Sequence, residues 1–281
     1  MLRGMSAPTV PCPSCGQPVP GAFCSACGER RFAAEELTVR AQVGQAFTGL
    51  FSVDGRLGRS LRALVSQPGF LAVEYCRGAR VRYMRPVQLL LVASLVYFVA
   101  QPWTGFNTFR ATYDLQVERQ VYSGHLAQFM RGALPAEPAA RAEFIARFDA
   151  AAGNLARSLV FSLVPVTALV MHLLGRRRGR GFVEHLVLAT HYVSFQLLVL
   201  YVGVLGAIGG LQRLRWIDYD EDLAGIGLTL ASGLWVVPAW RRFHGVGWGG
   251  AVLAGGLVAL ANLPIVLEYR YLLFWLSYLA A

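Results

Sequence analysis

The sequence predicts an α-helical integral membrane protein with about five transmembrane helices and a small cysteine-rich head at its N-terminus. Hydrophobic residues make up 55% of the 281 residues and charged residues 15%, whereas soluble domains carry about 25% charged residues. Four cysteines also occur in two pairs within the first 27 residues. We expect a head at 1–34, basic juxtamembrane helices at 35–85 and a bundle at 86–281 with an outer segment at 104–156.

Five stretches approach the roughly 20 apolar residues that a spanning helix requires. A proline suited to a first helical turn opens the first of them, and Pro165 predicts a kink in the second. The tail "YLLFWLSYLAA" is apolar but short, and it either extends the fifth span or lies in the interface. The predicted spans are Pro86–Trp103, Leu155–Leu174, Phe182–Gly209, Leu223–Trp240 and Val246–Leu267.

The distribution of arginine predicts that the N-terminus lies in the cytosol. All 26 basic residues are arginine, and no apolar run of signal-peptide type opens the chain. With the N-terminus inside, the inner segments hold 17 arginines and 6 acids, whereas the outer segments hold 9 arginines and 10 acids. Every loop agrees with the positive-inside pattern.

The juxtamembrane segment alternates arginine with leucine and aromatic residues. One helix is expected to begin at the cap Asp54 and to stop at Pro68-Gly69. Such helices lie in an anionic headgroup layer, so anionic lipids are an expected partner. Nucleic-acid binding is less favoured, because the position beside the membrane already accounts for the charge. The expected membrane-surface residues are Arg56, Arg59, Arg62, Arg77, Arg80, Arg82 and Arg85.

The stretch "CPSCGQPVPGAFCSAC" predicts a structural zinc site. Each Cys-x2-Cys pair forms a tight knuckle, and the glycine after it permits the backbone to turn. Four thiolates fill a tetrahedral shell and leave no open position for catalysis, and zinc can supply the folding energy that so small a head lacks. A disulfide pair or a redox Cys-x-x-Cys is less favoured in a reducing compartment. The expected zinc ligands are Cys12, Cys15, Cys24 and Cys27, and Cys76 is left as a spare cysteine.

Four segments in order resemble the bacterial membrane family named domain of unknown function 3667. They are "FCSACGERR", "LGRSLRALVSQPGF", "EYCRGARVRYMRP" and "FVEHLVLATHYVSF". The resemblance implies an N-terminal zinc ribbon followed by transmembrane helices in a bacterial inner membrane. It implies no activity.

Ionisable residues near the inner ends of two spans form a second candidate site. Glu184 and His191 share a helix face in "VEHLVLATH", His185 lies off that face, and His172 is expected at a similar depth. Intramembrane ionisable groups are candidates for a proton or metal relay. The alternative is that Glu184 and His185 begin a helix at headgroup level while His191 is hydrogen-bonded inside the bundle.

These features favour a non-enzymatic protein of the bacterial inner membrane, because no nucleophile–base pair or phosphate loop is present. In this interpretation the zinc ribbon docks an unknown protein partner and the bundle anchors or regulates it. The rival interpretation is a small transporter or ion pathway that uses His172, Glu184, His185 and His191.

Overall fold

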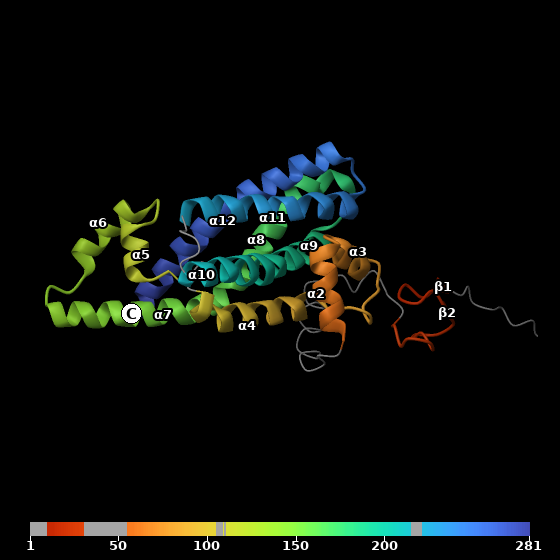
Figure 1. Cartoon of the computed structure of the whole chain (residues 1–281), viewed down its shortest axis with the longest axis horizontal. Helices are drawn as coiled ribbons and strands as arrows, with labels where there is room; N and C mark the ends of the chain where they lie inside the picture. Colours follow the sequence, from red (N-terminus) through yellow and green to blue (C-terminus); the bar gives the residue numbers. More distant parts are fainter. Residues whose placement is uncertain (1–9, 31–54, 105–108, 110, 215–220) are drawn as a thin grey trace, which may run out of the picture.

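The computed structural model describes residues 10–30, 55–104, 109, 111–214 and 221–281, apart from the side chains of residues 104 and 221–224. The described parts form an elongated molecule, with the cysteine head at one end and the C-terminus near the other (Figure 1). Residues 35–54 of the predicted juxtamembrane segment, with the expected cap Asp54, lie outside the described residues.

The head contains two short pieces of β structure that fold around the cysteines. Strand β1 (Val10–Pro11) pairs antiparallel with β2 (Pro18–Val19), and a single bridge joins Phe23 to Arg30. Val19 is buried together with Cys12 and Cys24. One buried valine is too little apolar surface for a stable core, which is why a bound metal is expected to hold the head together.

Helices α2 (Arg56–Ser66) and α3 (Phe70–Cys76) follow, and each buries part of its surface in the core of the bundle. Trp235 of the bundle donates a 2.8 Å hydrogen bond from Nε1 to the carbonyl of Leu64. The predicted stop at Pro68-Gly69 is confirmed, because Gly69 adopts φ 77° between the two helices. An added Cβ at Gly69 would lie 2.7 Å from Ala239, so glycine permits this close approach.

Within the described residues, four helical segments are long and apolar enough to cross a membrane: Pro86–Trp103, Pro138–Arg178, Phe182–Arg213 and Trp248–Ala280. They contain the predicted first, second and third spans and all but the first two residues of the fifth. The predicted fourth span, Leu223–Trp240, lies in α11 (Glu221–His244), but its first two side chains lie outside the description. Five spans therefore stay a prediction.

Two of these segments depart from a regular α-helix. The second consists of α7 (Pro138–Leu159), a 3₁₀ turn η2 (Val160–Ser162), α8 (Leu163–Gly175) and a second 3₁₀ turn η3 (Arg176–Arg178). The turn η2 ends three positions before Pro165, where a kink is predicted because proline has no N–H to donate to the preceding turn. The third consists of α9 (Phe182–Phe195), a π-helix η4 (Gln196–Val204) and α10 (Leu205–Arg213).

The remaining helices complete the bundle. Helix α4 (Pro86–Thr104) packs against α9 and η4, and α11 packs along α12 (Trp248–Ala280). An added Cβ at Gly255 of α12 would lie 2.9 Å from the Gly233 carbonyl of α11, so these backbones touch. Close approach through small residues is typical of helices packed in lipid.

The outer segment forms a second apolar cluster with the end of α12. Helices α5 (Tyr113–Glu118), α6 (Ser123–Ala133) and α7 surround Phe274, and buried Leu126, Met130 and Phe148 belong to the same cluster. The tail "YLLFWLSYLAA" is therefore a continuation of α12 and not a separate interfacial segment. Figure 1 shows the blue end of α12 running toward α5 and α7.

Candidate metal centre and histidine cluster

The two Cys-x2-Cys pairs form two knuckles with the same backbone hydrogen bonds. The amide of Cys12 donates to the Gln17 carbonyl at 2.8 Å, and the amide of Cys24 donates to the Glu29 carbonyl at 2.7 Å. In each knuckle the glycine amide donates back to the carbonyl of the first cysteine at 2.9 Å. These glycines have φ of 78° and 72°, a region that only glycine occupies without strain.

The four cysteine sulfurs meet at one point between the knuckles. Cys12 Sγ lies 3.6 Å from Cys27 Sγ, Cys15 Sγ lies 3.5 Å from Cys24 Sγ, and all four lie within 4.8 Å of one another. Zinc–sulfur bonds of about 2.3 Å in a tetrahedron separate the sulfurs by about 3.8 Å. The donor set therefore fits a single tetrahedral ion and could hold a metal without any other ligand.

The thiols of the cluster do not all ionise equally. The amides of Ala26 and Cys27 donate to the Cys24 sulfur and lower its pKa to about 7. The Glu29 amide lowers the pKa of Cys27, but burial and the three neighbouring sulfurs together raise it to about 12. Four crowded thiolates repel one another, so full ionisation of this cluster requires a cation among them.

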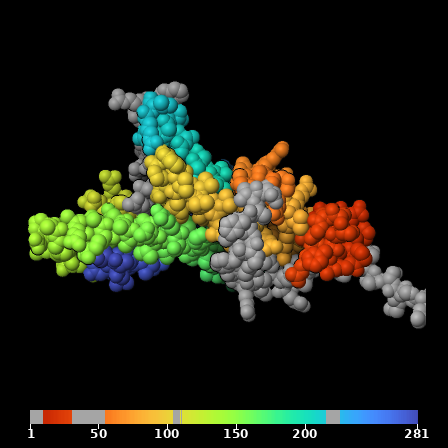
Figure 2. All heavy atoms as spheres, turned by 90° about the horizontal axis from the view of Figure 1, so that it is seen from below, coloured from red at the N-terminus to blue at the C-terminus, as the bar shows by residue number. Residues whose placement is uncertain are grey.

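The carboxylate of Glu29 joins the head to the segment between α3 and α4. This side chain is 4% exposed. Its Oε2 accepts hydrogen bonds from the Ser14 hydroxyl at 2.5 Å and from the backbone amides of Arg80 at 2.8 Å and Val81 at 2.9 Å. Figure 2 shows the red head against the orange juxtamembrane segment. Because the main chain of Glu29 belongs to the second knuckle, the same residue shapes the metal site and fixes its position.

The expected membrane-surface arginines divide into two groups. Arg59, Arg62, Arg77 and Arg82 are exposed, whereas Arg56, Arg80 and Arg85 are half-buried. The guanidinium of Arg80 stacks 4.7 Å above the ring of Tyr75, so it is held within the protein. The spare Cys76 is half-buried nearby, and burial raises its pKa to about 12, which keeps the thiol protonated.

Three histidines gather at the end of the bundle nearest the head. His172 Nδ1 of α8 lies 3.4 Å from His185 Nδ1 of α9, and the His185 ring centroid lies 5.2 Å from that of His244 in α11. Gly175 faces them: an added Cβ would lie 2.6 Å from His185 Nε2 and 2.8 Å from His244 Cε1. In the described part of the chain, His185 Nε2 and both ring nitrogens of His244 are buried without a protein hydrogen-bond partner.

Glu184 and His191 make separate interactions. Glu184 accepts hydrogen bonds from Arg180 Nη1 at 2.5 Å and from the Gly181 amide at 2.8 Å, at the beginning of α9. His191 is buried, and its Nδ1 lies 2.8 Å from the Val187 carbonyl one turn earlier. The structure thus brings His172 and His185 together and adds His244, which the sequence did not suggest.

A comparison with protein families matches residues 54–98 to a family described as Protein of unknown function (DUF3667). The matched residues run from the turn before α2 into α4, and they include the amides of Arg80 and Val81 that bind Glu29. The resemblance stated from the sequence is confirmed, and the four-cysteine cluster and apolar helices agree with it. No curated protein and no solved structure matches the chain.

Proposed function

We propose that this DUF3667-like chain is a non-enzymatic, multi-pass protein of the bacterial inner membrane whose zinc-loaded head docks a cytosolic protein partner. The single observation that carries the proposal is the buried Glu29 carboxylate, which binds the amides of Arg80 and Val81. A head bound in this way presents one fixed face beside the membrane, as a docking surface requires.

The face offered to a partner contains exposed apolar side chains on the head. Phe23 is 62% exposed and Val10 is 46% exposed. Aromatic residues are enriched at protein interfaces, and a closed four-thiolate site supports such a surface without taking part in chemistry. The partner should therefore carry a complementary apolar pocket.

The test is site-specific photocrosslinking in living cells, with a crosslinking amino acid in place of Phe23. A discrete crosslinked protein is expected from this position and not from Val121, which is 90% exposed on the outer segment. The pair Cys12→Ser and Cys15→Ser should remove both the metal and the partner. Phe23→Asp is assayed by the amount of the identified partner recovered with the chain. It should abolish this recovery and leave the zinc content unchanged, whereas Val121→Asp should change neither quantity.

Two results would overturn this function. A purified chain that contains no zinc would exclude the metal ribbon. Recovery of the identified partner with Phe23→Asp at the level of the native chain would exclude the docking face. The crosslinked species is identified by mass spectrometry, and zinc is measured in the same membrane preparation.

A proton or ion pathway is the second candidate function, and the proximity of His172 and His185 favours it. Adjacent imidazoles inside a membrane protein can pass a proton. In reconstituted vesicles, His185→Gln should then abolish flux without changing the amount of folded protein. Equal flux in the variant and the native chain would exclude a pathway through this cluster.

A further inference from the structure

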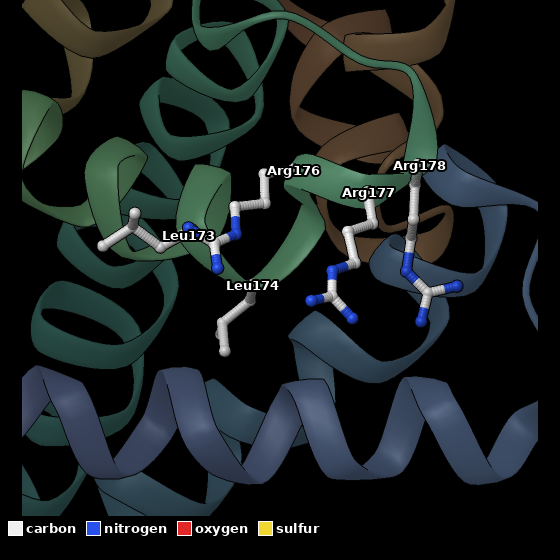
Figure 3. A pocket seen from close by; sticks show the side chains of 5 residues that line it. All are labelled: Leu173, Leu174, Arg176, Arg177 and Arg178. Carbon is white, nitrogen blue, oxygen red and sulfur yellow. The ribbon is translucent and has the colours of Figure 1, made fainter.

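The last turn of α8 and the turn that follows it line an open cavity that has no role in the proposed docking function. Its volume is about 480 Å³, and its lining is Leu173, Leu174, Arg176, Arg177 and Arg178. Figure 3 shows Leu174, Arg177 and Arg178 extending toward the blue ribbon, while the guanidinium of Arg176 folds back beside Leu173. Two apolar and three cationic side chains thus face one space.

The three guanidinium groups are available to a ligand. In the parts of the chain that the structure describes, Arg176, Arg177 and Arg178 make no hydrogen bond or ion pair with the protein. Arg180 in the same turn behaves differently, because it pairs with Glu184 and donates to the Phe243 carbonyl. Planar guanidinium groups bind phosphate oxygens in a bidentate manner.

The first turn of α12 adds to the positive potential around the cavity. An added Cβ at Gly250 would lie 3.9 Å from Arg178 Nη2, so this arginine reaches over the beginning of α12. Unpaired amides and the helix dipole at such an end attract anions. Arg241 lies 4.6 Å above the ring of Trp248, an aromatic residue of the kind found at headgroup level.

The apolar side of the cavity distinguishes a lipid from a soluble phosphate. Leu173 is 53% exposed and Leu174 is 36% exposed. Both belong to the last turn of a helix that is long and apolar enough to cross a membrane. An acyl chain can lie along Leu173 while a phosphate is held by the arginines one turn further on.

We propose that this cavity binds the phosphate headgroup of an anionic phospholipid from the adjoining leaflet. Basic pockets between transmembrane helices bind such headgroups. The phosphate contacts Arg176, Arg177 and Arg178, and the acyl chain lies along Leu173. The site is separate from the head, so the proposed lipid binding does not depend on the proposed docking function.

The experiment measures lipid retention by native mass spectrometry on the full-length chain in detergent micelles. The probes are phosphatidylglycerol, phosphatidylcholine and glycerol 3-phosphate. Phosphatidylglycerol should bind about tenfold more tightly than phosphatidylcholine, and millimolar glycerol 3-phosphate should not displace it. The triple variant R176Q/R177Q/R178Q should bind phosphatidylglycerol at least tenfold more weakly than the native chain.

Two further variants keep the test specific to the cavity. R119Q/R131Q/R147Q removes the same charge from exposed arginines of the outer segment, and it should bind phosphatidylglycerol as the native chain does. R176K/R177K/R178K preserves the charge that orients the chain in the membrane. It should bind several-fold more weakly than the native chain, because lysine cannot form the bidentate contact.

Three outcomes would overturn the lipid site. Equal binding losses in the two glutamine variants would show that total charge, and not the cavity, attracts the lipid. Native-like binding by R176Q/R177Q/R178Q would exclude these arginines. Displacement by glycerol 3-phosphate at the affinity of the lipid would assign the cavity to a soluble phosphate compound.

Discussion

Removal of the Glu29 carboxylate should release the head from the juxtamembrane segment without emptying the metal site. Its bonds to the amides of Arg80 and Val81 are 2.8 and 2.9 Å long. A hydrogen bond to a charged group contributes about 1.5–3 kcal/mol, so Glu29→Ala should cost the docked position about 3–6 kcal/mol. Because 1.4 kcal/mol corresponds to a factor of ten, the docked population should fall about 10²- to 10⁴-fold relative to the released one.

Hydrogen exchange reads this change directly. The amides of Arg80 and Val81 are protected by Glu29, so they should exchange faster in Glu29→Ala by a factor in that range. Glu29→Gln keeps an oxygen acceptor without the charge and should give an intermediate rate. Zinc content should be unchanged, because the main-chain carbonyl of Glu29, not its side chain, accepts from Cys24. Native exchange rates at both amides in Glu29→Ala would refute the reasoning.

Three more changes test other parts of the molecule. Gly175→Ala places a Cβ 2.6 Å from His185 Nε2 and should cost about 1–3 kcal/mol of stability by overpacking. The midpoint of thermal unfolding should therefore be lower in this variant. Gly210→Ala, whose Cβ meets nothing within 4 Å, should leave the midpoint unchanged. Phe274→Ala removes the side chain at the centre of the second apolar cluster and should cost about 3–5 kcal/mol of stability. A protease should then cleave α5–α7 faster than in the native chain. An unchanged digestion rate would contradict the packing of these helices around Phe274. Apparent zinc affinity should fall as the pH falls, because the pKa of the Cys27 thiol is raised to about 12 and its proton competes with the metal. The decline should become steeper below about 7, where the Cys24 thiolate also takes up a proton. A competing chelator measures the affinity, and a constant value down to pH 5 would argue against thiolate ligation.

Long apolar runs and the paired cysteines could be interpreted correctly from the sequence, because both depend on residues that are close together in the chain. The helix that begins at Pro86 starts where the apolar run and its proline predict it, because an apolar stretch of spanning length has few other stable structures. The four cysteines meet as their spacing predicts, because each knuckle is closed by hydrogen bonds between residues at most five positions apart. Neither inference needed knowledge of distant contacts.

The contacts that position the candidate sites are distant in sequence, and the pattern did not reveal them. Glu29 binds amides that lie 51 and 52 residues later, and the only local signal was a single acid between a cysteine knuckle and two arginines. His244 follows the predicted fourth span by four residues, and no pattern in the sequence indicates that it packs against His185. The π-helix at Gln196–Val204 had no sequence signal, because its apolar residues suit a regular α-helix equally well.

Helix α12 also sets a mechanical property of the molecule. Its 33 residues span about 50 Å at 1.5 Å per residue, whereas the hydrocarbon core is about 30 Å thick. One end lies beside Arg178, and the other is embedded among the aromatic side chains around Phe274. One continuous helix therefore joins the arginine cavity to the aromatic cluster around Phe274, and Pro264, which interrupts the backbone hydrogen bonds, is the point where that helix can bend.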